Sequence, residues 1–170
     1  MTGPVFALDC PAPEDHSARL SALIAAAQKA SNELEGRQIG QQMWALWADA
    51  PDEPSQEILD RGIARRESYD FLGAMKEFDR LVSYCPDYAE GYNQRAFVNY
   101  IRQDYGAALP DLDQALVLSP HHVAARAGKA LTLMQLGRID AAREQLKQAL
   151  ELNPWLSERH LMGPGGPLEI

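Results

Sequence analysis

Apolar residues recur at helical spacing along most of the chain, in short stretches that polar turns separate. Between residues 89 and 122, one stretch covers 97–101, and a second has leucines at positions 109, 112 and 116. A spacing of three to four residues places apolar side chains on one face of a helix. The intervening segment 103–106 is polar and contains a glycine. The pattern therefore predicts pairs of helices joined by tight turns.

This two-helix pattern repeats every 34 residues, which defines contiguous units at 55–88, 89–122 and 123–156. Small residues at two columns allow paired helices to approach closely, and a proline column ends each second helix. One hairpin cannot bury its apolar face alone, so the units must stack into an all-α α-solenoid. The five aligned columns are Gly62, Ala96 and Ala130; Ala74, Ala108 and Ala142; Phe78, Leu112 and Leu146; Leu81, Ala115 and Ala149; and Pro86, Pro120 and Pro154.

Two more helices are expected before the repeats, over 15–30 and 38–48, with a turn at 32–36 between them. We interpret 14–54 as a degenerate fourth hairpin that caps the first repeat, preceded by an extended leader over 1–13. Trp44 and Trp47 would fill the seam with that repeat; the alternative is an exposed aromatic platform for a ligand.

The segment 157–170 follows the last repeat. Residues 157–162 could form a short capping helix, with Trp155 and Leu161 sealing the last open face. Terminal repeats need such a cap. The glycines and prolines that follow predict a frayed tail.

The units resemble the tetratricopeptide repeat, a 34-residue helical hairpin with small residues at its eighth and twentieth positions and a proline near its end. The resemblance covers 55–156 and implies a right-handed superhelix of about three hairpins. It departs from the usual pattern at the fourth position, where only Tyr92 is aromatic. Segments 43–47, 89–96 and 118–122 also resemble a poorly characterised bacterial family of small repeat proteins that has no established activity.

In tetratricopeptide proteins the first helices line a concave groove that binds a peptide or helix. The resemblance implies an apolar groove floor, with Asn93 bonding a peptide backbone and Phe97 and Tyr100 holding its side chains. The alternative places several of these residues, particularly Leu131 and Ile63, in the core between repeats. The groove positions are Leu59, Ile63, Arg66, Asn93, Gln94, Phe97, Tyr100, Ile101, Leu131 and Met134.

The lysine, asparagine and arginine residues that chaperone-binding members use as a two-carboxylate clamp are missing here. The clamp positions hold Leu59, Ile63, Gln94, Ala124 and Gly128. Binding of a chaperone C-terminal peptide is therefore not expected.

The composition excludes two classes of partner. The chain has 170 residues and a net charge of −8, which disfavours binding to nucleic acid or to anionic membranes. The longest stretch without a charged residue, 114–125, is too short for a membrane span. Most of the acidity lies in residues 1–54, which have three basic and eight acidic residues, whereas 123–156 is net basic.

The two cysteines, Cys10 and Cys85, are expected at the same edge of the solenoid. They could form a disulfide that closes a long loop, or they could be two reduced thiols of a cytosolic protein, which the sequence slightly favours. Val5 and Ala7 stand as in a signal-peptidase site, but no apolar segment precedes them. The chain as given is expected in the cytoplasm, and in the periplasm if a longer precursor carries a signal peptide.

No motif for a nucleophile, a phosphate loop or a dinucleotide is present, so we expect neither an enzyme nor a cofactor. His121 and His122 are expected on a surface turn and do not indicate a metal site, and His16 and His160 have no identifiable partners. The acidic residues are interpreted as a helix cap at Asp104 and as solvated side chains at Asp111 and Asp113.

The most economical hypothesis is a protein-interaction module that holds a peptide or helix in the concave groove. The alternative is a structural or self-assembling solenoid, in which the tail at 167–170 or a second copy of the chain covers the groove.

Overall fold

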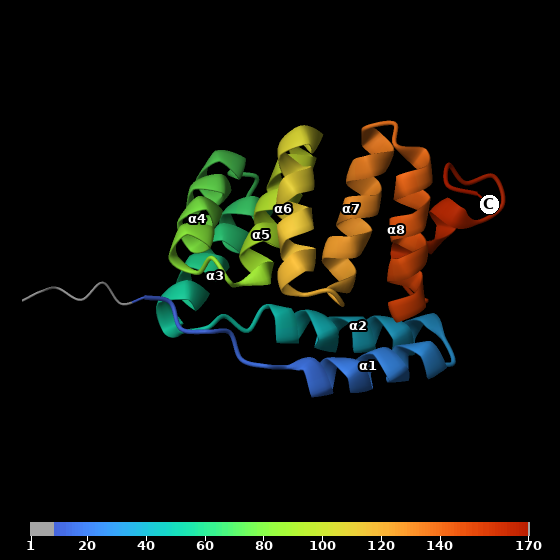
Figure 1. Ribbon diagram of the computed structural model, residues 1–170, viewed down its shortest axis with the longest axis horizontal. Helices are drawn as coiled ribbons and strands as arrows, with labels where there is room; N and C mark the ends of the chain where they lie inside the picture. The colour runs from blue at the N-terminus through green and yellow to red at the C-terminus, as the bar shows by residue number, and fades with distance from the viewer. Residues whose placement is uncertain (1–8, 170) are drawn as a thin grey trace, which may run out of the picture.

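Three consecutive helical hairpins stack in one row, and each hairpin forms one repeat (Figure 1). The computed structural model describes residues 9–169. Each predicted unit holds two consecutive helices, although the first of them begins two residues before residue 55. The α-solenoid that the sequence predicts is confirmed. The six helices are α3 (Glu53–Glu67), α4 (Phe71–Tyr84), α5 (Ala89–Ile101), α6 (Tyr105–Leu118), α7 (Val123–Gln135) and α8 (Ile139–Leu152).

The repeated small residues lie where paired helices touch. Ala74, Ala108 and Ala142 are fully buried. At Gly62 a Cβ atom would lie 2.3 Å from the Phe78 ring, so α3 and α4 pack at a distance that only glycine permits at this position.

Aspartates cap two of the second helices. Asp70 accepts a hydrogen bond from the Gly73 amide at 2.9 Å, and Asp104 accepts one from the Ala107 amide at 3.1 Å. The prediction that Asp104 caps a helix is confirmed. These bonds satisfy amides that have no partner inside the helix.

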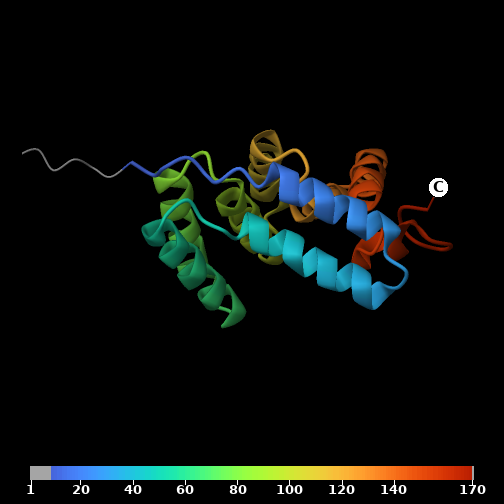
Figure 2. The same cartoon turned by 90° about the horizontal axis from the view of Figure 1, so that it is seen from below.

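The N-terminal hairpin, α1 (Ser17–Lys29) and α2 (Glu33–Trp47), does not continue the row as a fourth repeat. It lies crosswise under one end of the repeat helices (Figures 1 and 2). Its apolar residues, among them Leu20 and Met43, share a core with Val123 and Leu152 of the third repeat. The expectation that the hairpin caps the first repeat is therefore wrong. An apolar stripe shows that a helix face is buried, but it does not show what covers that face.

The hairpin is attached to the far end of the row through the last turn of α1. The side chain of Gln28 donates to the Glu151 carbonyl of α8, and the Trp155 indole donates to the Ala27 carbonyl. Trp155 thus binds the hairpin, and it does not seal the last repeat as expected. The turn is also shorter than predicted, because Asn32 caps α2 and residues 33–37 are helical.

The C-terminal segment is folded. A 3₁₀ helix, η1 (Ser157–Met162), stands where a short capping helix is expected, and Leu161 packs against the third repeat. Beyond it, Leu168 is fully buried against the same core, and its carbonyl accepts a bond from Arg143. The expected frayed tail is therefore ordered through residue 169, and it covers the end of the third repeat, not the groove.

None of the helices described is long and apolar enough to cross a membrane. The cleavage motif expected at Val5 and Ala7 lies outside the described residues.

Candidate functional site

A cavity of about 440 Å³ opens between the first helices of the second and third repeats. Phe97 and Tyr100 of α5 and Leu131 of α7 line it, and Trp44 of α2 contributes to the lining from the N-terminal hairpin. Residues 156–158, which follow α8, complete the lining. We call this cavity the groove.

Six of the ten predicted groove residues line it, namely Arg66, Asn93, Gln94, Phe97, Tyr100 and Leu131. Leu131 is half-buried there, so the alternative that places it wholly in the core does not describe its position.

The other four predicted residues do not line the groove. Leu59 is fully buried in the core of the first repeat, against which Ile63 also packs. Met134 packs against the core of the third repeat, and Ile101 is partly exposed outside the groove. The groove is formed mainly by the second and third repeats, so the equivalent positions of the first repeat contribute only Arg66.

Trp44 is a groove residue that the repeat pattern cannot identify. Its side chain is 43% exposed and lines the groove, whereas Trp47 stacks on His122 with ring centroids 4.2 Å apart. Each of the two expected roles therefore applies to one tryptophan: Trp47 fills a seam, and Trp44 is an accessible aromatic surface. The seam of Trp47 is with the boundary between the second and third repeats, not with the first repeat.

His122 is fully buried, which corrects the expectation of a surface turn. Its Nδ1 accepts a bond from the Ala125 amide at 3.2 Å and so caps α7, while Nε2 lies 2.8 Å from the Glu90 carboxylate. The repeat alignment offers a signal for this burial. His122 occupies the same repeat position as Tyr88, 34 residues earlier, and Tyr88 is also buried.

Polar side chains form one wall of the groove. Asn93 and Gln94 are almost completely buried and donate to Glu90 at 3.2 and 2.5 Å. Asn93 therefore has one amide hydrogen already committed, and it cannot offer a complete amide edge to a peptide as the sequence suggests.

Arg66 lies at the edge of this wall. Its guanidinium stacks over the Phe97 ring, 4.9 Å from the centroid, and donates to the Gln94 side-chain oxygen. Burial lowers the pKa of Arg66, while the charges of Glu67 and Glu90 act to raise it. Arginine remains protonated at neutral pH, so Arg66 is a fixed positive charge beside an apolar surface.

The two acidic side chains expected to be solvated, Asp111 and Asp113, have structural partners. Asp111 is buried, not solvated as expected, and pairs with Arg95 through two bonds of 2.7 and 2.8 Å. These bonds raise the pKa of Arg95. Asp113 is exposed and pairs with Lys129 at 2.7 Å.

His16 has partners that the sequence does not reveal. Its Nε2 lies 2.7 Å from Asp49, and its Nδ1 lies 3.8 Å from Glu14. The two carboxylates lie on different nitrogens of one imidazole, so the cluster ties the N-terminal arm to the segment that follows α2.

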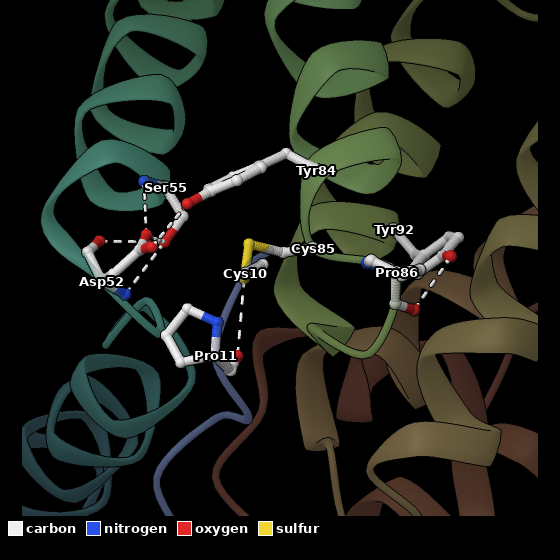
Figure 3. Close-up of a disulfide and its surroundings, with 8 residues drawn as sticks. All are labelled: Cys10, Pro11, Asp52, Ser55, Tyr84, Cys85, Pro86 and Tyr92. Atoms are coloured by element: carbon white, nitrogen blue, oxygen red, sulfur yellow. Dashed lines mark hydrogen bonds between the residues drawn. A yellow bond between two sulfur atoms is a disulfide. The ribbon is translucent and has the colours of Figure 1, made fainter. Parts of the chain in front are cut away.

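A disulfide joins Cys10 to Cys85 at the end of α4 (Figure 3). The structure thus has the bridge and not the two reduced thiols that the sequence slightly favours. Beside it, Asp52 accepts bonds from the Tyr84 hydroxyl at 2.7 Å and the Ser55 amide at 2.9 Å. Burial acts to raise the pKa of Asp52, but these hydrogen bonds outweigh it and lower the pKa.

Comparison with known proteins identifies the repeat. A tetratricopeptide-repeat family model matches residues 100–155. Tetratricopeptide repeat protein 36 of Mus musculus is 32% identical over 121 residues, which are 69% of this chain and 65% of that protein. Its homologue in Nematostella vectensis is 37% identical over 73 residues, 43% of this chain and 40% of that protein. The chain thus matches less than two thirds of the length of these relatives.

Solved structures agree on the fold. The TPR2B domain of yeast Sti1, in a complex with pHsp70, superposes with a TM-score of 0.58 at 22% identity, covering 62% of this chain and 87% of that domain. The second TPR domain of human RPAP3, in complex with an HSP70 peptide, gives 0.57 at 23% identity, covering 59% and 84%. Together with the 34-residue hairpins and their buried small residues, these matches show that the repeat helices have the tetratricopeptide-repeat fold.

Proposed function

We propose that the groove binds a peptide or helix of a partner protein and that apolar side chains of the partner anchor it. The observation that carries this proposal is the pair of accessible aromatic side chains at the groove, Phe97 at 46% and Trp44 at 43% exposure. Accessible aromatic rings beside a concave apolar surface are typical of protein-binding sites.

The dimensions and chemistry of the groove support a small apolar anchor. Its volume of about 440 Å³ lies within the range of pockets that bind ligands, and most of its lining is apolar. Arg66 and Glu158 are the charged residues that line it. The residues between them, including Leu112 and Leu131, favour aliphatic or aromatic side chains of a partner.

The anchor differs from a two-carboxylate clamp. The human RPAP3 domain is solved with an HSP70 peptide, but this chain has Ala124 and Gly128 at two positions where the clamp needs basic side chains. Without these basic side chains the groove lacks the clamp's cationic site for a terminal carboxylate, so we infer an apolar anchor.

The proposal is tested by selecting peptides from a random phage-displayed library on the immobilised protein. The affinity of the best peptide is then measured by fluorescence anisotropy for wild type, Phe97→Ala and Val117→Ala. Val117 is 72% exposed on α6 and lies outside the groove, which makes it a matched control for the loss of an exposed apolar side chain. We expect Phe97→Ala to weaken binding at least about tenfold and Val117→Ala to leave it unchanged.

Selected peptides that bind wild type and Phe97→Ala equally well would place the interaction elsewhere. A selection that returns no peptide dependent on Phe97 would contradict the groove as the binding site.

A further inference from the structure

Glu90 is a fully buried carboxylate that the proposed function does not use directly. It accepts hydrogen bonds from Asn93 at 3.2 Å, from Gln94 at 2.5 Å and from the His122 ring at 2.8 Å. A buried carboxylate is costly unless donors satisfy it, and here three donors converge on it.

The second bond of His122 indicates which ring nitrogen donates to Glu90. Nδ1 accepts the Ala125 amide, so it carries no hydrogen, and Nε2 must be the nitrogen that donates to Glu90. Asn93 and Gln94 also donate to Glu90, so all three of its hydrogen-bond partners are donors.

The bonds continue from Glu90 to the surface of the groove. The amide nitrogen of Gln94 is held by Glu90, which turns its side-chain oxygen toward Arg66, and Arg66 donates to that oxygen. Arg66 also stacks on Phe97 and forms an ion pair with Glu67 at 3.8 Å, so three contacts hold its guanidinium, and its side chain is 16% exposed. A guanidinium has five N–H donors, and those that these contacts leave free can bind a partner.

Buried contacts also connect His122 and its surroundings to the N-terminal hairpin. Trp47 of α2 stacks on His122 with an interplanar angle of 11°, and its carbonyl accepts the Tyr88 hydroxyl at 2.7 Å. Burial raises the pKa of Tyr88, which keeps this hydroxyl protonated as a donor. The seated hairpin and the groove thus share one set of buried contacts.

We propose that Glu90 and His122 are positioning residues of the groove, which hold Gln94 so that Arg66 presents its free donors to an acceptor oxygen of the bound peptide. This inference rests on the proposed function. It assigns to Arg66 the one polar contact that orients a ligand whose affinity comes from apolar anchors.

The first test needs no ligand. In a nitrogen-15 spectrum of the full chain, the side-chain amide signals of Asn93 and Gln94 are compared for wild type, Glu90→Gln and His122→Asn. Asparagine can still cap α7, so His122→Asn removes the bond to Glu90 and the stacking on Trp47 while it keeps the bond to Ala125. We expect both variants to shift the Gln94 amide signals and speed their exchange with solvent, with most backbone signals unchanged. Unchanged Gln94 signals in a folded variant would overturn the proposal.

The second test uses a Phe97-dependent peptide from the library selection as the probe. We expect Glu90→Gln and Arg66→Met each to weaken binding about tenfold, and the double variant to bind no more weakly than either single one, since both act on one hydrogen bond. Tyr84→Phe, which loses the bond to Asp52 far from the groove, serves as the reference for a loss of stability alone and is expected to leave the affinity unchanged. Additive losses, or full affinity in Glu90→Gln, would contradict the positioning role.

The dependence on salt identifies the acceptor oxygen. If the acceptor is a carboxylate of the partner, the affinity that Arg66 contributes decreases as the salt concentration rises. If the acceptor is a backbone carbonyl, this contribution does not change with salt. In either case the Arg66 contribution must disappear in Glu90→Gln. If no selected peptide depends on Phe97, the proposed function fails, while the amide signals still decide whether Glu90 holds Gln94.

Discussion

Two glycines one turn apart on α2 meet different neighbours. A Cβ atom at Gly36 would lie 2.1 Å from the Trp155 ring, whereas one at Gly40 would lie 3.4 Å from the Asn153 amide. Gly36 therefore allows the hairpin to rest directly on Trp155, which fastens it to the end of the third repeat.

We predict that Gly36→Ala lowers the free energy of unfolding by about 1–3 kcal/mol, because the methyl group overlaps a partly buried ring. Gly40→Ala is the matched control and should be neutral or stabilising by up to about 1 kcal/mol, since alanine favours the helix. Urea unfolding measures both. Equal stability of the two variants would mean that α2 does not lie against Trp155.

At the scale of elements, the C-terminal segment closes the last repeat with a single buried side chain. Leu168 is fully buried against Ala142, Leu146 and Ala149, although prolines and glycines surround it. We predict that Leu168→Ala lowers the free energy of unfolding by about 2–4 kcal/mol, the usual cost of emptying a leucine site. Hydrogen exchange should become faster in α8 first.

The matched control for Leu168→Ala is Leu136→Ala, which removes a leucine that is 40% exposed on the same repeat. It should change the stability by less than about 1 kcal/mol. If both variants are equally stable, the segment does not cover the third repeat in solution.

For the whole molecule, the N-terminal hairpin and the disulfide add long-range ties to a fold in which each repeat otherwise contacts only its neighbours. The hairpin packs on α8, and the disulfide ties the arm that precedes the hairpin to the end of α4. Opposite ends of the row are thus connected through the N-terminal 50 residues.

We predict that the Cys10→Ala/Cys85→Ala double variant loses about 2–4 kcal/mol of unfolding free energy, because the bridge closes a loop of 75 residues that is open in the variant. A reducing agent should cause the same loss in wild type and no loss in the double variant, which guanidinium unfolding can measure. A wild type that is indifferent to reduction would show that the bridge does not stabilise the fold.

The sequence predicts the part of the fold that repeats and fails where one element meets another far along the chain. Three matching copies of Ala74 and its equivalents report the same local helix contact, so the hairpins and their stacking could be predicted. The hairpin contacts α8 through single residues such as Trp155 and Gln28, which have no repeated counterpart. Its place under the row could therefore not be read from periodicity.

The repeat pattern likewise predicts the part of the groove that repeat positions form. Phe97, Tyr100 and Leu131 occupy repeat positions that face inward, and they line it. Trp44 reaches the groove from outside the repeats, and Glu90 is a buried charge at a position where an exposed one is the ordinary expectation. Both depend on contacts between elements that no spacing encodes.

The central claim is that a partner occupies the groove, and mapping a bound peptide by nitrogen-15 chemical shifts tests it most directly. The account predicts that a peptide from the library selection shifts the backbone amides of Phe97 and Leu131 and the indole signal of Trp44. Shifts confined to the second helices α4, α6 and α8, with these three signals unmoved, would contradict it.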